Sequence, residues 1–376
     1  MKRAVCISCT HHYTERMAPV LATLRAAGYE CTYITSDYNH YTKQHYKITD
    51  LPDCEQLPTL AYKKNISHQR IVSHMRFARD AFARVEQLQP DLVYVEVPPN
   101  SLCKEAARYK KRHPEVKVIF DLFDLWPESF PDHRAKFLFR LPFRVWGSLR
   151  NKYLHTGDLV LTECDLYRKT LAPYLKDTHQ QTLYLCRPGA TTQAAKCLPE
   201  QAEIHLCYLG FINNLIDIPT ISALLGHLRQ LRPVVLHIIG DGETRNDFIA
   251  AAENAGAKVE FYGKIYDVDQ KQAIFDRCSF GLNIMKDSVC VGLTLKSLDY
   301  FGGALPILNS IQADTREFVE SRGVGINIDR NDLAATARQI AAITPAQQQE
   351  MGENTLQMFD ELFTETVFQK TLLSVL

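Results

Sequence analysis

Short apolar runs rich in β-branched residues alternate along this chain with longer segments of helical period. The apolar runs cover residues 5–9, 31–35, 91–97, 116–121 and 158–163, and then 204–210, 233–240, 258–263, 280–284, 305–309 and 324–328. Helical period is found at 14–27, 68–88, 100–113 and 134–152. Strands separated by helices are typical of parallel βαβ units, so we expect an α/β protein with two doubly wound, Rossmann-like sheets.

A Pro-Gly turn at 188–189 breaks the pattern between the two series of strands. We therefore predict an N-terminal domain over 1–186 and a C-terminal domain over 187–358. The last residues, 359–376, have helical apolar spacing and are expected to form a helix that can pack back on the first domain. Open α/β sheets bind ligands at the carboxyl ends of their strands, so the expected site is a cleft between the two domains.

Charge and cysteine content narrow the class of protein. Lys and Arg number 43, Asp and Glu also number 43, and 46% of the residues are hydrophobic, which excludes bulk nucleic-acid binding and disorder. Eleven cysteines and a first segment unlike a signal peptide favour a reduced, cytoplasmic protein. Cys6 and Cys9 are three apart on an expected strand and point to opposite faces, so neither metal nor redox chemistry is expected there.

The segment 291–308 carries the most informative pattern. Apolar residues at 295, 298 and 301 predict a short helix, and Thr294 stands at its N-cap position. Lys296 lies in the first turn of this helix, where free backbone N–H groups and the helix dipole attract anions. The alternative is an ordinary ion pair between Lys296 and Asp299 on a solvated helix face.

This segment resembles the nucleotide-sugar signature of the family-four retaining glycosyltransferases of the GT-B fold. Their pattern is Glu, seven residues, Glu, and then Ala-x-x-x-Gly-x-Pro-Val. Counted back from Pro306, the second Glu falls on Asp299 and the first on Val291. The resemblance implies that Asp299 binds the ribose hydroxyls, and that the backbone amides that follow Val291 hold the diphosphate.

Other segments of the second half match the same family. The Gly-Asp-Gly turn at 240–242 follows a strand, but Arg245 stands where a dinucleotide-binding dehydrogenase has its third glycine. The resemblance places Gly263 and Tyr262 at the nucleobase, although Tyr262 can also be a plain strand aromatic.

The family commonly grips the diphosphate with an Arg and a Lys after the first strand of the second domain. Phe211 replaces that Arg here, and no Lys follows. Lys296, with Lys264 or Arg245, is then expected to meet the phosphate charge. Asn213 supplies hydrogen bonds to the donor or forms an ordinary turn.

In the first half, residues 121–131 end a strand and enter a loop that holds Asp124, Trp126 and Glu128. Aromatic faces stack on sugar rings and carboxylates accept hydroxyls, so this loop is a candidate acceptor site; the alternative is a loop anchored by a buried Trp. The loop resembles the His-Asp-Leu-Trp-Pro-Glu-Ser run of O-antigen and exopolysaccharide transferases, with Phe123 in place of His. In the retaining mechanism of the family, the leaving diphosphate oxygen serves as the base.

Two further features concern the acceptor and the membrane. His11, His12 and Arg16 follow the first strand and are expected to contact anions; the alternative for the two histidines is a surface pair without a role. The stretch 134–152 has six Lys and Arg, no Asp or Glu, and interleaved aromatics. Such a segment lies on an anionic membrane surface or is a crossover helix with a basic outer face.

The resemblance implies a metal-independent transferase that moves a hexosyl-type sugar from a nucleoside diphosphate to a hydroxyl, without a further cofactor, in bacterial surface polysaccharide synthesis. The acceptor is a saccharide or a lipid-linked saccharide. Two alternatives stay open: a nucleotide-sugar epimerase of the same fold and a non-catalytic GT-B partner protein. The candidate residues are Asp124 and Lys296 for catalysis; Asn213, Gly242, Tyr262, Gly263, Gly292, Leu293, Thr294, Lys296 and Asp299 for the donor; and His11, His12, Arg16, Asp124, Trp126 and Glu128 for the acceptor.

Overall fold

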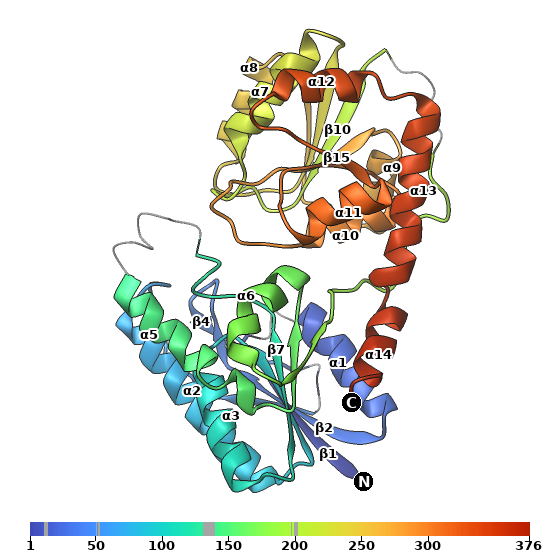
Figure 1. Cartoon of the computed structure of the whole chain (residues 1–376). Coiled ribbons are helices and arrows are strands. Elements are labelled where there is room, and N and C mark those ends of the chain that lie inside the picture. The colour runs from blue at the N-terminus through green and yellow to red at the C-terminus, as the bar shows by residue number, and fades with distance from the viewer. Residues whose placement is uncertain (11–13, 50, 52, 131–139, 197, 199–201) are drawn as a thin grey trace. The chain divides into compact units, whose positions relative to one another are not determined.

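The computed structural model describes residues 1–10, 14–49, 51, 53–130, 140–196, 198 and 202–376. They form two compact units (Figure 1). The first unit comprises Met1–Leu185 together with Phe368–Leu376, and the second comprises Cys186–Val367.

The first unit is built on a seven-stranded parallel sheet with the order β5-β2-β1-β6-β7-β8-β9. The strands are β1 (Lys2–Ile7), β2 (Tyr29–Ser36), β5 (Cys54–Leu57), β6 (Leu92–Val97), β7 (Lys117–Leu122), β8 (Leu159–Thr162) and β9 (His179–Thr182), and β3 (Tyr38–Asn39) pairs with β4 (Gln44–His45). The helices are α1 (Thr14–Ala26), α2 (His68–Leu88), α3 (Ser101–Arg112), α5 (Arg140–Asn151), the 3₁₀ helix η2 (Leu154–Thr156), α6 (Asp165–Leu175) and α14 (Glu365–Leu373), which crosses into this unit at Phe368.

The central strands of this sheet read as continuous apolar runs because helices cover both of their faces. All six residues of β6 are buried, and α2, α3 and α5 pack side by side (Figure 1). The chain runs outward from β1 to β2 and β5 and then returns to β6. The topological switch point of the sheet therefore lies between β1 and β6.

The second unit contains a six-stranded parallel sheet with the order β12-β11-β10-β13-β14-β15. The strands are β10 (Ile204–Leu209), β11 (Val234–Ile239), β12 (Lys258–Gly263), β13 (Phe280–Asn283), β14 (Ile307–Asn309) and β15 (Gly325–Asn327). The helices are α7 (Ile218–Arg229), α8 (Arg245–Asn254), α9 (Val268–Phe275), α10 (Leu295–Gly302), α11 (Asp314–Arg322), α12 (Leu333–Ala341) and α13 (Pro345–Leu362).

A single apolar core joins the inner strands of this second sheet to α7, α8 and α12. Leu206, Leu236 and Leu282 are fully buried in it, one from each of three adjacent strands. Helices α10 and α11 both pack against α13 (Figure 1). The switch point of this sheet lies between β10 and β13.

The pattern of apolar runs located the main strands correctly: each of the eleven runs overlaps a strand of the two sheets. The short or polar strands β3, β4, β5 and β9 were not predicted. The predicted helix over 134–152 corresponds to α5, and its residues 134–139 lie outside the described residues. No disulfide joins two of the ten described cysteines, and within the described ranges no helix is both long and apolar enough to cross a membrane.

Candidate functional site

The loops after β10, β11 and β13 meet at the carboxyl edge of the second sheet. Gly210 N–H donates to the carbonyl of Ile239 at 2.9 Å, and Lys286 N–H donates to the carbonyl of Leu215 at 3.0 Å. The first contact joins the ends of β10 and β11, and the second joins the loops across the switch point between β10 and β13. The predicted donor segments at 213, 240–242 and 291–299 are all drawn from this edge of the second unit.

Gly242 has a packing role in this arrangement. Its α-carbon faces the β10 loop so closely that a β-carbon would lie 2.1 Å from the carbonyl oxygen of Ile212. At Gly240, where φ is +142°, a β-carbon would lie 1.9 Å from the carbonyl oxygen of Gly210. Both glycines are required because two backbones approach each other, which leaves the loop ends next to one another.

The start of α10 is fixed by hydrogen bonds from the strand ends. Thr294 caps the helix, as predicted: its Oγ1 accepts from Ser297 N–H at 3.3 Å. The same hydroxyl donates to Asn283 Oδ1 at 3.0 Å. Tyr300 OH, one turn further on, accepts from Leu209 N–H at 2.7 Å, which ties α10 to the end of β10.

Asn283 is the first member of an asparagine ladder that the sequence analysis missed. Asn283 Nδ2 donates to Asn309 Oδ1 at 3.0 Å, and Asn309 Nδ2 donates to Asn327 Oδ1 at 2.8 Å. Each of these residues is the last of its strand, in β13, β14 and β15. The recurrence of Asn at the last or next-to-last position of three apolar runs is the signal that could have revealed the ladder.

The loop between β13 and α10 is held by a half-buried arginine. Arg330 pairs with Asp217 at 2.7 Å, and its other terminal nitrogen donates to the carbonyl of Met285. Met285 N–H donates in turn to Ser310 Oγ at 2.9 Å. The first part of the loop is therefore fixed, and among the described residues no acceptor is found for the N–H groups of Gly292, Leu293 and Thr294.

Lys296 lies in the first turn of α10 without an acidic partner among the described residues. Its Nζ is 4.6 Å from the centroid of the Tyr208 ring, and burial lowers the pKa of its ammonium to about 8. A half-buried ammonium that faces only an aromatic ring lowers the stability of the folded protein unless an anion binds beside it. The ion pair with Asp299, which was the alternative prediction, does not form.

Asp299 is engaged elsewhere in the second unit. Arg187 Nε donates to Asp299 Oδ1 at 3.2 Å, and Lys271 Nζ donates to the same oxygen at 3.3 Å. Neither cation was singled out from the sequence, since they lie 112 and 28 residues away from Asp299. Both cations donate to Oδ1, and no hydrogen bond to Oδ2 is found among the described residues.

Tyr262 is a strand aromatic with a structural network, which was the plainer of its two predicted roles. Its OH donates to Glu260 Oε2 at 2.7 Å, and its ring stacks on that of His237 with an interplanar angle of 8°. His237 is completely buried, and burial lowers its pKa to about 4. Gly263 has φ +68° and accepts at its carbonyl from Gly240 N–H at 2.7 Å, so it serves the turn after β12.

The remaining polar candidates near the diphosphate position are turned toward the protein or toward solvent. Asn213 Oδ1 accepts from Leu215 N–H at 3.0 Å, which is the ordinary turn that was one of its two readings. Arg245 pairs with Asp241 at 3.2 Å. Lys264 is exposed. Unlike the exposed Lys264, Lys296 is half-buried, and no acidic partner is found for it among the residues described.

In the first unit, Asp124 follows β7 and is half-buried beside polar groups. Ser129 Oγ donates to Asp124 Oδ1 at 2.7 Å. Burial raises the pKa of the Asp124 carboxyl, while the hydrogen bond from Ser129 and the charges of Arg70 and Arg150 act in the opposite direction. The carboxyl is therefore suited to hydrogen bonding with a hydroxyl.

Trp126 and Glu128 belong to the same loop and are both tied to Arg150. Arg150 is fully buried; it donates to the carbonyl of Trp126 at 3.0 Å and pairs with Glu128 at 2.6 Å. The Trp126 ring meets those of Phe143 and Trp146 edge to face. The loop is anchored by α5, as in the structural alternative, and Glu128 has an ion-pair role.

Arg16 was predicted to contact anions, but the structure places its side chain in the core of the first unit. The side chain is completely buried, and its guanidinium makes a two-pronged pair with Asp121, at 2.8 and 2.6 Å. It also donates to the carbonyls of Leu183 and Tyr184. Arg16 comes soon after a strand, but it lies in the helix α1, which directs its side chain into the core. His11 and His12 lie outside the described residues.

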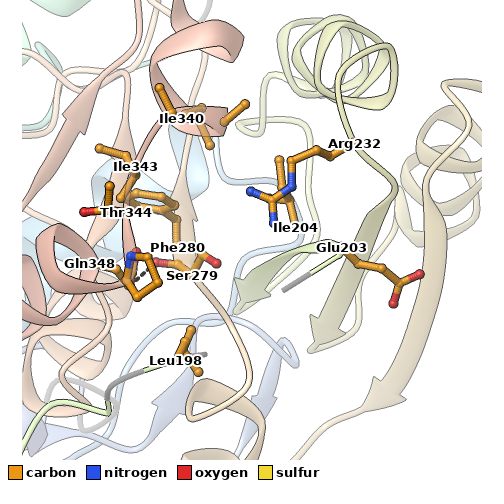
Figure 2. A pocket seen from close by; sticks show the side chains of 13 residues that line it. Leu198, Glu203, Ile204, Arg232, Ser279, Phe280, Ile340, Ile343, Thr344 and Gln348 are labelled. Carbon is orange, nitrogen blue, oxygen red and sulfur yellow. Dashed lines mark hydrogen bonds between the residues drawn. The ribbon is translucent and has the colours of Figure 1, made fainter. Parts of the chain in front are cut away.

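A cavity of about 280 Å³ lies at the opposite edge of the second sheet (Figure 2). Ile204 and Phe280, at the starts of β10 and β13, form part of its wall together with Ile340, and Arg232 and Glu203 stand at its margin. Because it opens at the amino ends of the strands, it is distinct from the edge where the loops of the candidate donor site meet.

Comparison with known proteins identifies the architecture. No family model and no curated protein sequence matches the chain. Sucrose-phosphate synthase from Thermosynechococcus elongatus is similar over 100% of this chain and 98% of its own, with a TM-score of 0.73 and 14% identity. WaaG, a glycosyltransferase involved in lipopolysaccharide biosynthesis, is similar over 98% of both chains, with a TM-score of 0.65 and 15% identity.

HepE from Anabaena, solved in complex with UDP and glucose, is similar over 100% of this chain and 99% of its own, with a TM-score of 0.64 and 11% identity. Sucrose-phosphate synthase and WaaG are glycosyltransferases of the GT-B class. The chain therefore has the GT-B fold, which confirms the predicted fold class.

Proposed function

We propose that this protein is a nucleotide-sugar-dependent glycosyltransferase. The observation that carries the proposal is Lys296: a half-buried cation in the first turn of α10, beside backbone N–H groups and without an acidic partner among the described residues. A diphosphate supplies the anion that this arrangement lacks. Support comes from the GT-B fold and from the neighbour HepE, which was solved with UDP and glucose.

In this proposal the second unit binds the donor. The amides of Gly292, Leu293 and Thr294 and the ammonium of Lys296 hold the diphosphate, and Asp299 accepts hydrogen bonds from the ribose through its free oxygen. Fixed donors of this kind stabilise the negative charge that develops on the leaving diphosphate. No metal ion or further cofactor takes part in the proposed reaction.

The first unit binds the acceptor in this proposal. Asp124 accepts or shares a hydrogen bond with the acceptor hydroxyl, and the Trp126 loop supports it. As in the retaining mechanism of the family that the sequence resembles, the leaving diphosphate oxygen takes the proton of the acceptor hydroxyl, and transfer of the hexosyl group retains configuration at the sugar. The role is the building of a bacterial surface polysaccharide.

The helix α5 supports contact of this transferase with a membrane surface. Leu141 and Val145 are 72% and 58% exposed, and Arg140 and Arg144 are exposed beside them. An exposed face of this composition suits the interface of an anionic bilayer, where a lipid-linked acceptor is found. Arg150 is buried and does not belong to this face.

The test is a thermal-shift panel of nucleotides and nucleotide sugars on the full chain, followed by product analysis with the best donor. A ligand at 100 times its Kd stabilises the protein by about 2.7 kcal/mol. We expect UDP or another nucleoside diphosphate to raise the Tm, and Lys296→Ala to reduce that affinity roughly tenfold or more. Lys258→Ala, at an exposed lysine at the amino end of β12, is the matched control and keeps the affinity.

Unchanged nucleotide affinity in Lys296→Ala would show that the diphosphate lies elsewhere. Nucleotide binding without transfer or hydrolysis would favour the non-catalytic alternative. An NMR spectrum in which the product is an epimer of the nucleotide sugar, with no sugar transferred, would favour the epimerase.

A further inference from the structure

Two segments of the first unit carry basic residues and no acidic ones. Residues 38–49 and 58–79 together contain seven Lys and Arg but no Asp or Glu. They follow β2 and β5, which are adjacent parallel strands, so both segments leave the same carboxyl edge of the sheet. Ligands of α/β sheets bind at this edge.

Two of these cations converge on one aromatic ring. Lys43 Nζ is 4.8 Å from the centroid of the Tyr62 ring, and the guanidinium carbon of Arg70 is 5.9 Å from the same centroid. Asn65 holds both: its Oδ1 accepts from Lys43 Nζ, and its carbonyl accepts from Arg70 Nη1 at 3.0 Å. Tyr62 is itself fixed, since its OH lies 2.9 Å from His40 Nδ1.

This pair of cations lacks a compensating carboxylate. In the described part of the chain, no Asp or Glu lies within ion-pair distance of Lys43 or Arg70. Burial lowers the pKa of Lys43, and the charge of Arg70 lowers it further. Two like charges repel each other, and an anion bound between them reduces this repulsion.

The pair also adjoins the candidate acceptor residues. The guanidinium carbon of Arg70 is 5.6 Å from the centroid of a Trp126 ring. The charge of Arg70 acts on the carboxyl of Asp124, and the carboxyl of Asp124 acts in turn on Tyr41, which is 64% exposed. The cations, the exposed aromatic ring and the predicted acceptor carboxylate therefore belong to one surface of the first unit.

We propose that Lys43 and Arg70 form a subsite for a negatively charged group, a carboxylate or a phosphate, on the acceptor saccharide. The guanidinium of Arg70 offers the planar pair of N–H donors that matches such a group, and the ammonium of Lys43 approaches from the other side of the same anion. This inference rests on the proposed transferase function, because it names the class of acceptor: an acidic rather than a neutral saccharide.

The experiment measures binding of three probes to the full chain by isothermal titration: trigalacturonate, glucose 6-phosphate and neutral maltotriose. We expect at least one acidic probe to bind more tightly than maltotriose. The double variant Lys43→Ala/Arg70→Gln should lose about tenfold or more in affinity for that probe. The preference for trigalacturonate or for glucose 6-phosphate tells which anion the subsite takes.

The matched control is Lys47→Ala/Arg79→Gln, which removes the same charge from the same two segments at exposed positions. It should keep the affinity of the wild type. Lys43→Ala alone repeats the test at a position where the fold is not at risk, and UDP binding measured in parallel reports on the second unit. Acidic-probe binding without nucleotide binding would refute the transferase proposal and leave the subsite standing.

Three results would overturn the subsite. One is equal affinity for acidic and neutral probes, or no binding of either acidic probe. Another is an equal loss of affinity in the control variant. The third concerns vesicles of phosphatidylglycerol: a loss of vesicle binding in the Lys43/Arg70 variant, with acidic-saccharide binding unchanged, would assign these cations to a membrane surface.

Discussion

At the scale of single residues, some cations of this chain pair with carboxylates of the fold, whereas others have no such partner among the described residues. Arg16, Arg150 and Arg330 are paired with carboxylates inside the protein, at 2.6 to 2.7 Å. Lys296 faces only an aromatic ring. A cation of the second kind lowers the stability of the folded chain and is retained where binding requires it.

Lys296→Met should therefore stabilise the ligand-free protein at pH 7, by on the order of 1 kcal/mol after allowance for partial exposure. The pKa of Lys296 is lowered to about 8 in the folded state, against an ordinary value of 10.5. Below pH 8 the charge is carried in both states, and its burial cost is fully present. Between pH 8 and 10.5 the folded protein releases the proton first, so the cost disappears and the gain from Met shrinks.

Chemical denaturation of Lys296→Met and wild type across pH 7 to 10 measures this difference, with Lys264→Met as the control at an exposed lysine. The stabilised variant should also lose the rise in Tm that a nucleoside diphosphate gives. A Lys296→Met protein that is less stable than wild type at pH 7 would mean that the ammonium is held favourably by the fold.

At the scale of elements, the pattern of the sequence predicted the buried strands and missed those with polar side chains. Strand β9 has the sequence HQQT, and none of its residues is fully buried. Its place is fixed by backbone pairing with β8, which no periodicity of side chains announces. The cap at Thr294 was predictable because a cap is a local contact, whereas the partners of Asp299 come from distant parts of the chain.

The asparagine ladder is an element-scale device, because it joins the ends of three strands to the start of α10. Asn309 is at its centre, where it also donates to the carbonyl of Ile311 at 2.8 Å and accepts from the N–H of Ile311 at 3.0 Å. Asn309→Ala leaves several buried groups without partners, and we expect a loss of roughly 2–4 kcal/mol in the free energy of unfolding.

Urea denaturation measures the loss in Asn309→Ala, and exposed Asn331→Ala is the control, expected to change stability by less than about 0.5 kcal/mol. Nucleotide affinity should fall in Asn309→Ala under conditions where the protein is still folded, because Asn283 then holds Thr294 less firmly. A destabilised variant with the affinity of the wild type would show that the ladder does not position α10.

At the scale of the whole molecule, the chain passes from the first unit to the second at Cys186 and returns at Phe368. Sequence length and a repeated series of strands indicated two doubly wound units, because each sheet needs its own core. The sequence predicted that a helix over 359–376 can pack back on the first domain, but the point of return could not be deduced. Helix α13 extends to Leu362, and the first unit resumes at Phe368, within α14.

Truncation after Val367 tests the contribution of the returning segment to the first unit. Phe368 and Leu372 are buried, and the guanidinium carbon of Arg16 is 5.4 Å from the centroid of the Phe368 ring. Burial of each such side chain contributes about 1.5–3 kcal/mol, so we expect the first unit to lose roughly 3–6 kcal/mol. Loss of the Phe368 ring would also expose the Arg16 guanidinium to water.

Hydrogen exchange read peptide by peptide separates this effect from general destabilisation. Protection should fall in α1 and β7 of the first unit, where Arg16 and Asp121 lie, and should persist in β10 and β11 of the second. Removal of residues 374–376 alone is the control, because it keeps Phe368 and Leu372 in place. If α1 and β7 keep their protection after truncation at Val367, the core of the first unit is complete without the returning helix, and Arg16 is held by Asp121 and the strand carbonyls alone.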